Sequence, residues 1–452
     1  MQQEHTWTNS MSPPSRPTIT ILHILSQQPG RTGSGVTLEA LVQGCFQSGY
    51  EQHVIVGTDT TDPTPTVANL PASHIHPLVF HTPALNFALP GMSDVMPYKS
   101  TIFSTMSLEQ LEIYRTAWKN HIQNVLDVVK PTLIHSHHIW IMSSILKDIA
   151  GGHIPIISHC HATGLRQMDL CGPALADEVQ RGCARNDHFV VLHHGHKESL
   201  MEKLKVDDHS KISIVGAGFN EEIFHARGRQ TQDPDVPLPP PQSKPIHLLF
   251  AGKLAHSKGL PQLLDAFSQL SQKDQKIQLH IAGSGNGEQA DQLRQRMESM
   301  SPDVILHGQV DQTTLATLMR QSDVFVLPSF YEGIPLVLVE AAACGCRLVC
   351  TNLPGVMEQL AGPLQEMLEV VELPRLQTID TPVKEELPEF VHRLVVALET
   401  AMKKSAVVMN INNKNGDENE VASIVAPFTW TAVYKRIEKV WHAVLEEKPL
   451  HN

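Results

Sequence analysis

The chain has 452 residues, of which 41% are apolar and 18% are charged, a balance that is typical of a globular protein and excludes a largely disordered one. Its net charge of −12 argues against a general nucleic-acid binder, which would carry a basic face, although a local basic pocket for phosphates is still allowed. The length exceeds what one ordinary core requires, so we expect two domains.

The first 17 residues are polar and lack the apolar core of a signal peptide, so we expect a disordered head there. The seven cysteines are odd in number and include no Cys-x-x-Cys pair, which argues against the disulfide framework of a secreted protein. No apolar run reaches the roughly 18 residues that a membrane-spanning helix needs. These features predict a soluble, cytoplasmic protein with no transmembrane segment.

The first domain is expected over residues 18–226. Its opening apolar run is followed by a glycine-containing loop, a segment with helical spacing and a second apolar run at 51–57, which is the strand–loop–helix–strand order of a Rossmann-like unit. Further strand-like runs, separated by helical stretches, follow at 131–137, 154–160, 188–194 and 211–216. This alternation predicts a parallel sheet that is covered on both faces.

Two glycine loops each follow an expected strand and open an expected helix. They are GRTGSG, which contains Gly33 and Gly35, and GSGNG at 283–287. Such loops let backbone N–H groups approach a phosphate at a helix N-terminus. Neither loop is a strict dinucleotide fingerprint, and a tight turn without a ligand is the alternative.

Histidines are dense in the first domain, where ten of the 26 lie between His135 and His196. They occur as HSHH, HCH and HHGH, each at the end of an expected strand, where open α/β sheets place their ligand crevice. A zinc or two-metal site is one alternative. Because no carboxylate recurs beside these histidines at ligand spacing, we expect no metal.

The second half repeats this organisation. The segment 227–245 is rich in proline and polar residues and predicts a linker. The alternation of strands and helices then restarts and predicts a second Rossmann-like domain over 246–427, with a polar surface insertion at 403–427. The last segment, 428–452, predicts an amphipathic helix that packs back on the first domain by a stripe of Trp430, Val433, Ile437 and Val440.

Two lysines and two glutamates stand out in the second domain. Lys253 and Lys258 lie between an expected strand and an expected helix, where they could grip a diphosphate or simply be solvated. Glu332 precedes a helix that Gly333 and Pro335 are suited to begin, and it either caps this helix or faces a ligand.

Glu340 lies about two turns into that helix, among leucine, valine and alanine. It is either a surface glutamate or a buried carboxylate, and a buried one needs polar partners such as ligand hydroxyls.

Taken together, these segments resemble the family-four glycosyltransferases over about residues 20–445. EGIPLVLVE matches the family's E-x7-E motif and is followed by AAACGCRLVCTNLPGVMEQL, which resembles its glycine-containing continuation. AGKLAHSKG, RTGSG and IVGAGFNEEIF are similar to three further motifs in the family order. The chain departs from the family at Lys253, where an arginine is usual; the charge is kept but the bidentate fork is lost.

The resemblance implies the GT-B fold, an α/β fold of two Rossmann-like domains that face each other across a cleft. The second domain would bind a nucleotide-sugar donor, with Glu340 on the ribose hydroxyls and Glu332 on sugar hydroxyls. Lys253 and Lys258 would neutralise the leaving diphosphate. The backbone at Gly333, Ile334 and Pro335 would face the donor sugar and phosphate.

The resemblance also implies that the donor base lies near Gly308 and Val310. In the first domain, a histidine near the anomeric centre aligns with His161, and His159 is the second choice. Gly33 and Gly35 would face the donor as part of the family's N-terminal glycine loop.

The implied reaction is a retaining, metal-independent hexosyl transfer to an unknown acceptor. Family frequency favours a UDP-sugar as donor, and no cofactor is expected. The alternatives on the same fold are a nucleotide-sugar epimerase, a phosphorylase and a non-catalytic sugar-nucleotide sensor. A dehydrogenase is disfavoured because neither glycine loop carries a complete fingerprint.

Overall fold

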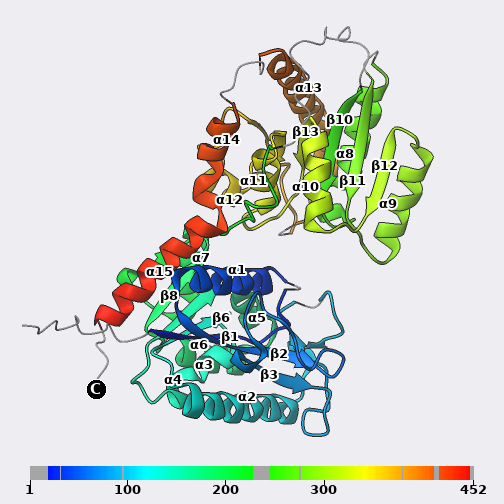
Figure 1. The fold of residues 1–452 in the computed structure, drawn as a ribbon. Helices are drawn as coiled ribbons and strands as arrows, with labels where there is room; N and C mark the ends of the chain where they lie inside the picture. The colour runs from blue at the N-terminus through cyan, green and yellow to red at the C-terminus, as the bar shows by residue number, and fades with distance from the viewer. Residues whose placement is uncertain are drawn as a thin grey trace, which may run out of the picture. The chain divides into compact units, whose positions relative to one another are not determined.

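The computed structural model of the chain describes residues 19–30, 32–93, 96–227, 245–273, 276–378, 380–411 and 417–447. The chain divides into two compact units (Figure 1): the first comprises the chain up to Val215 together with the segment from Tyr434 onward, and the second runs from Gly216 to Val433. The expected head at 1–17 and nearly all of the expected linker at 227–245 lie outside the described residues.

The first unit is built on a parallel sheet in the order β3-β2-β1-β6-β7-β8-β9. Its strands are β1 (Thr20–Leu25), β2 (Glu51–Asp59), β3 (Ile75–Phe80), β6 (Leu133–His137), β7 (Ile156–Cys160), β8 (His188–Val191) and β9 (Ile212–Ile214). The strand order reverses between β1 and β6. A small separate sheet pairs β4 (Pro90–Gly91) with β5 (Thr101–Ile102).

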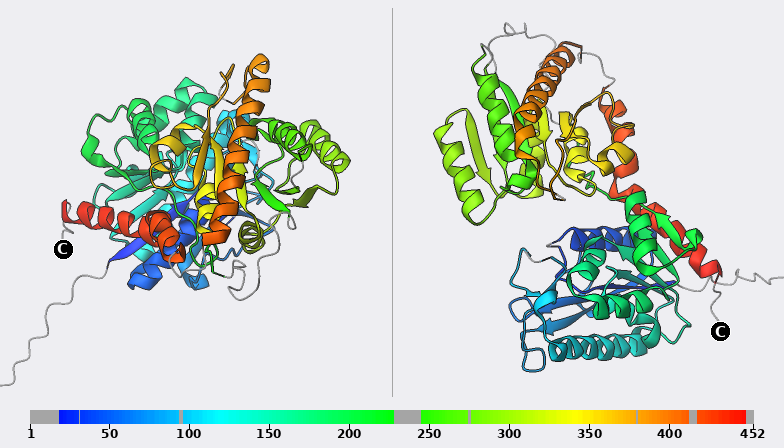
Figure 2. Two further views of the ribbon diagram at one scale, coloured as in Figure 1. Left: turned by 90° about the horizontal axis from the view of Figure 1, so that it is seen from above. Right: turned by 180° about the vertical axis from the view of Figure 1, so that it is seen from behind.

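Helices cover both faces of this sheet, and α1 and α2 lie on opposite sides (Figures 1 and 2). Successive side chains of β2 point to opposite faces of the sheet: Ile55 belongs to the core beneath α2, whereas Val54 and Val56 belong to the core beneath α1. Both faces are therefore apolar, as in other covered parallel sheets. The helices are α1 (Gly33–Ser48), α2 (Leu108–Val129), α3 (Ile141–Ser144), α4 (Leu146–Ile149), α5 (Thr163–Leu170), α6 (Pro173–Cys183) and α7 (His194–Leu204).

The second unit has a parallel sheet in the order β12-β11-β10-β13-β14-β15, with its reversal between β10 and β13. The strands are β10 (Ile246–Ala251), β11 (Ile277–Ala282), β12 (Val304–Gly308), β13 (Val324–Leu327), β14 (Arg347–Thr351) and β15 (Leu368–Val371). The helices are α8 (Leu260–Ser271), α9 (Glu288–Ser299), α10 (Gln312–Gln321), α11 (Leu336–Ala343), α12 (Pro354–Gln359), α13 (Leu387–Ile411) and α14 (Asp417–Val425). The predicted fold class of two Rossmann-like α/β units is confirmed.

The expected polar surface insertion at 403–427 is largely helical where the structure describes it. Helix α13 continues to Ile411, and α14 packs against α11. Ser405 and Val425, near the two ends of the segment, are buried. Within the described residues, no helix combines the length and the apolar character needed to cross a membrane.

Helix α15 (Trp430–Glu447) begins in the second unit and ends in the first. The Trp430 amide donates a hydrogen bond of 3.0 Å to the Phe219 carbonyl, and from Tyr434 onward the helix packs in the first unit. Tyr434 lies so close to α1 that a Cβ atom on Gly44 would stand 2.3 Å from its ring. A glycine at this position therefore permits the contact between α1 and α15.

Gly44→Ala should destabilise the first unit, because the added methyl group must displace the Tyr434 ring or the helix backbone. We expect a loss of about 1–3 kcal/mol in the free energy of unfolding, measured by urea denaturation. Gly362→Ala is the control, since no atom lies within 4 Å of a Cβ built there. Equal stability of the two variants would contradict the close packing of α15 on α1.

Candidate functional site

The carboxyl ends of β10 and β13 form the reversal point of the second sheet, where open α/β sheets bind ligands. The loop after β10 carries Lys253 and Lys258, and the loop after β13 carries Glu332 and leads into α11. Parallel pairing of these two neighbouring strands brings both loops to one edge. The structure thus gathers the lysines and Glu332, which lie far apart in the sequence.

Glycines allow these loops to approach one another. Gly259 has a φ of 67°, and a Cβ atom there would lie 2.0 Å from the Pro328 carbonyl oxygen. The Phe330 amide then donates a 2.9 Å hydrogen bond to the Ser257 carbonyl. The loops after β10 and β13 are therefore joined directly through their backbones.

Lys258 and Glu332 form an ion pair, with 2.7 Å between Nζ and Oε1. Ser329 Oγ donates to the same carboxylate oxygen at 2.8 Å. No described residue bonds to Oε2 of Glu332, and the ammonium group of Lys258 has two further N–H donors. Both side chains can therefore meet a polar ligand without giving up their mutual contact.

Lys253 is exposed and has no ion pair or side-chain hydrogen bond among the described residues. Its ammonium group is therefore available to an anion at the edge where β10 ends. With Lys258 it supplies two cations, of which one is already balanced by Glu332. Lys253 thus has no counter-ion among the described residues.

Glu340 lies in the second turn of α11, where burial raises the pKa of its carboxyl group to about 7. No described residue forms a hydrogen bond or ion pair with this carboxylate. The absence of a compensating partner is what a site for ligand hydroxyls requires, because an ionised carboxylate away from water needs donors.

Gly308 and Val310 lie at the end of β12, on the same edge of the sheet. The Gly308 carbonyl accepts a 2.7 Å hydrogen bond from the Gly283 amide, and Val310 packs against the core. Gly333 and Ile334 precede α11, and Pro335 is its N-cap residue. A cavity of about 490 Å³ lies between α9 and β12, and no expected site residue lines it.

In the first unit, Gly33 begins α1 at the carboxyl end of β1. The Gly35 amide is engaged by Thr32, which caps the helix with a 3.1 Å hydrogen bond. The Gly33 amide has no such partner among the described residues. Of the two glycines, Gly33 is thus the one whose N–H is open to a phosphate.

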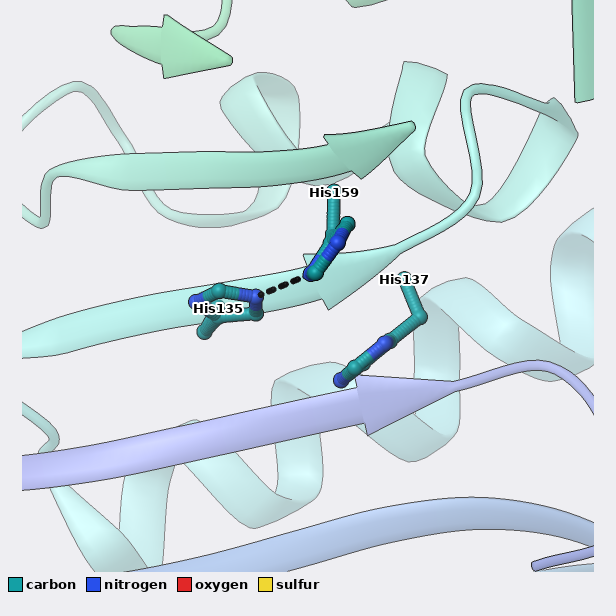
Figure 3. Close-up of side chains that lie close together, drawn as sticks. All are labelled: His135, His137 and His159. Carbon is teal, nitrogen blue, oxygen red and sulfur yellow. Dashed lines mark hydrogen bonds between the residues drawn. The ribbon is translucent and has the colours of Figure 1, made fainter. Parts of the chain in front are cut away.

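His159 lies near the end of β7, beside His135 and His137 of β6 (Figure 3), and His161 directly follows β7. His159 is 1% exposed, whereas His161 is only partly buried. Of the two candidates, His161 is therefore the one that a ligand could reach. The four rings form two hydrogen-bonded pairs. His137 Nδ1 lies 3.0 Å from His161 Nε2, and His135 Nε2 lies 3.4 Å from His159 Nδ1.

Sequence reasoning included His138 in the HSHH cluster but gave it no role; its backbone has a φ of 73° although it is not glycine. Its Nε2 lies 3.0 Å from Gln27 Oε1, and its Nδ1 lies 3.1 Å from Thr163 Oγ1. Gln27 also accepts a 2.8 Å hydrogen bond from Ser34 Oγ. A residue with such a strained backbone, at the point where the strand order reverses between β1 and β6, marks a functional site. In the sequence, the position of His138 directly after a strand could have indicated this.

Three buried histidines could hold a metal ion, since the ligand nitrogens of His135, His137 and His159 all lie within 4.8 Å of one another. The Trp441 indole N–H, however, donates to His135 Nδ1 at 2.9 Å. An indole nitrogen can only donate, so Nδ1 must be the acceptor and Nε2 must carry the proton. His135 in this tautomer has no lone pair left for a metal, and two histidines are too few for a zinc site.

The comparisons with known proteins agree with this arrangement. Residues 235–362 match the family model of glycosyl transferases group 1. The resemblance to the family-four glycosyltransferases is therefore confirmed. Glycogen synthase of Mycobacterium tuberculosis is 26% identical over 236 residues, which make up 51% of this chain and 54% of that enzyme. The chain thus spans about half the length of this curated relative.

Solved structures resemble nearly the whole chain. Sucrose-phosphate synthase from Thermosynechococcus elongatus has a TM-score of 0.64 and 17% identity, over 95% of this chain and 100% of that one. Anabaena HepE in complex with UDP and glucose has a TM-score of 0.59 and 16% identity, over 94% of this chain and 100% of that one. At these identities the likeness shows the fold, which is the GT-B fold.

The hydrogen bond from Trp441 predicts that the histidine cluster holds no metal. The purified protein should contain no stoichiometric zinc by elemental analysis, and excess EDTA should leave its thermal midpoint unchanged. Trp441→Phe removes the indole donor, frees His135 to adopt the other tautomer and should permit added zinc to raise the midpoint. Zinc bound to His135, His137 and His159 in the wild-type protein would contradict the tautomer assigned to His135, whereas zinc on Glu51, His53 and His74, the other group of possible ligands, would not.

Glu340→Gln should stabilise the second unit above pH 7. The pKa of the carboxyl group rises from 4.5 to about 7 on folding, so between these values the unfolded chain loses its proton while the folded chain keeps it. The wild-type protein therefore loses stability as the pH rises through this range, and the amide variant does not. We expect a gain of about 2 kcal/mol, below the full value of the shift because the side chain keeps some contact with solvent.

The measurement is urea denaturation near pH 5 and near pH 8, with the exposed Glu298→Gln on α9 as control. The gain should be present near pH 8 and small near pH 5. A gain of the same size at both pH values would mean that ionisation of Glu340 is not its cause.

Proposed function

We propose that this protein is a retaining glycosyltransferase that moves a hexosyl group from a UDP-sugar to an acceptor bound by the first unit. The observation that carries the proposal is the ion pair of Lys258 with Glu332 at the reversal point of the second sheet, with Lys253 in the same loop as Lys258 and Glu340 in the helix that follows Glu332. The complex of HepE with UDP and glucose, on the same fold, supports a uridine nucleotide as the donor carrier.

In the proposed reaction, the bond between the sugar and the diphosphate breaks, so negative charge builds on the diphosphate. Lys253 and Lys258 would stabilise the negative charge of the diphosphate, and cations that are already in place need no rearrangement when this charge develops. Because these lysines neutralise the leaving group, the reaction needs no metal ion. The leaving phosphate would assist deprotonation of the acceptor on the same face, which retains the anomeric configuration.

The two glutamates would fix the donor. Oε2 of Glu332 is open to the sugar hydroxyls while Oε1 stays with Lys258. Ribose hydroxyls would donate to Glu340, whose carboxylate has no other partner among the described residues. The base would lie near Gly308 and Val310, beside the backbone of Gly333, Ile334 and Pro335. From the first unit, His161 would contact the sugar and Gly33 would contact the phosphates.

The acceptor would be selected by the first unit. A cavity of about 200 Å³ lies at the carboxyl ends of β1, β2 and β3, and its lining includes Gln28, Asp59, Asp62, Tyr98 and Lys99. Its volume and its mixture of acidic, basic and amide groups suit a small polyhydroxylated ring. Tyr98 and Lys99 come from the segment 90–103, in which the family motifs have no counterpart.

Glu340→Ala should raise the donor KM about 10- to 100-fold, because it removes hydrogen bonds to a charged group that hold the donor before and during reaction. His161→Ala should instead lower kcat, because its contact lies next to the reacting carbon. The assay is UDP release with the UDP-sugar that gives the largest thermal shift in a panel of nucleotide sugars.

Glu298→Ala is the matched control, since it removes an exposed glutamate of the same unit. Full turnover in both site variants would contradict the proposed assignment. Tight donor binding without turnover in any cell extract would favour a sugar-nucleotide sensor instead.

A further inference from the structure

The ring of His161 is held on one face and at one nitrogen. His159 stacks on it with 4.3 Å between ring centroids and 13° between planes. His137 Nδ1 lies 3.0 Å from His161 Nε2, and these two rings are 11° from parallel with their centroids 5.3 Å apart. His137 and His161 are thus nearly coplanar, edge to edge, which is the geometry of an in-plane N–H···N hydrogen bond.

One proton lies between His137 Nδ1 and His161 Nε2, and the ring that carries it determines the tautomer of both residues. Burial lowers the pKa of both imidazoles well below the usual value, so each ring is neutral and carries a single N–H. If His161 donated through Nε2, the proton of His137 would have to sit on its own Nε2. That nitrogen is buried and has no hydrogen-bond partner.

The opposite assignment avoids this cost. When His137 donates through Nδ1, its Nε2 is a bare lone pair, which is cheaper to bury than an N–H without an acceptor. His161 then accepts at Nε2 and carries its proton on Nδ1. No described residue bonds to this Nδ1, and it is absent from the buried polar atoms that lack a partner, so it is open to a ligand.

We propose that His137 is a positioning residue that fixes the tautomer of His161, so that His161 presents an N–H donor to an oxygen atom of its ligand. On the proposed function, on which this role rests, that oxygen belongs to the donor sugar or to the phosphate. His161 then acts by donating a hydrogen bond, and it does not remove a proton from the acceptor. The tautomer of the neighbouring His135 is determined independently, because the Trp441 indole N–H donates to His135 Nδ1.

The chain offers a matched pair of variants at this position. In His137→Asn, the side-chain amide places an N–H donor close to where Nδ1 of the imidazole lies. In His137→Leu, the donor is lost while the volume is roughly kept. Both variants alter a completely buried residue, so only the presence of the donor separates them.

The first measurement is long-range ¹H–¹⁵N NMR of the full chain labelled at histidine, which reports the protonated nitrogen of each ring. His161→Gln identifies the His161 signals. We expect the proton on Nδ1 in the wild-type protein and in His137→Asn, and a shift toward Nε2 in His137→Leu. A wild-type His161 protonated at Nε2, or one whose tautomer is the same in His137→Leu, would overturn the role of His137.

The second measurement is turnover. We expect His137→Leu to lower kcat about tenfold with the donor KM within about twofold, and His137→Asn to recover most of the rate. A thermal midpoint for each variant separates loss of the donor from loss of structure. Equal loss of kcat in both variants at equal stability would overturn the proposal. The NMR result needs no substrate, so absence of turnover with every nucleotide sugar contradicts the proposed function alone.

Discussion

The second unit depends on a close approach of two loops that only a glycine permits. Gly259 brings the end of the loop after β10 against the Pro328 carbonyl, and any side chain there would push the loops apart. Because of this contact, Lys258 reaches Glu332 across 74 residues of sequence. The ion pair thus depends on the same contact that brings the two loops together.

Much of this arrangement could be predicted from the sequence, because its causes are local. Apolar runs bounded by glycines predict buried parallel strands, and the ends of such strands gather at one edge whatever the side chains are. The unfavourable burial of Glu340 could also be expected, since its neighbours along the helix are apolar. In these cases the order of apolar and polar residues along the chain is enough to predict the structure.

The histidine pairs could not be predicted, because they depend on how β6 and β7 align. The register places Ser136 opposite Ser158 and His137 opposite His159. A shift by one residue would separate the rings that now share protons. Trp441 contributes from the other end of the chain, and nothing near it in sequence indicates His135 as its acceptor.

The two units differ in how they treat polar groups at their sheet edges. In the first unit, histidine, glutamine, serine and threonine side chains bond one another and hold the rings before a ligand arrives, although Nε2 of His137 and of His159 has no partner among the described residues. In the second unit, Glu340 has no partner among the described residues, and burial raises the pKa of its carboxyl group, so folding alone does not favour its charge. Hydroxyl groups that donate to this carboxylate would favour the ionised form and return the free energy that burial costs. A site that is strained in this way discriminates strongly against a ligand that lacks the hydroxyls, because such a ligand leaves the buried carboxylate unpaired.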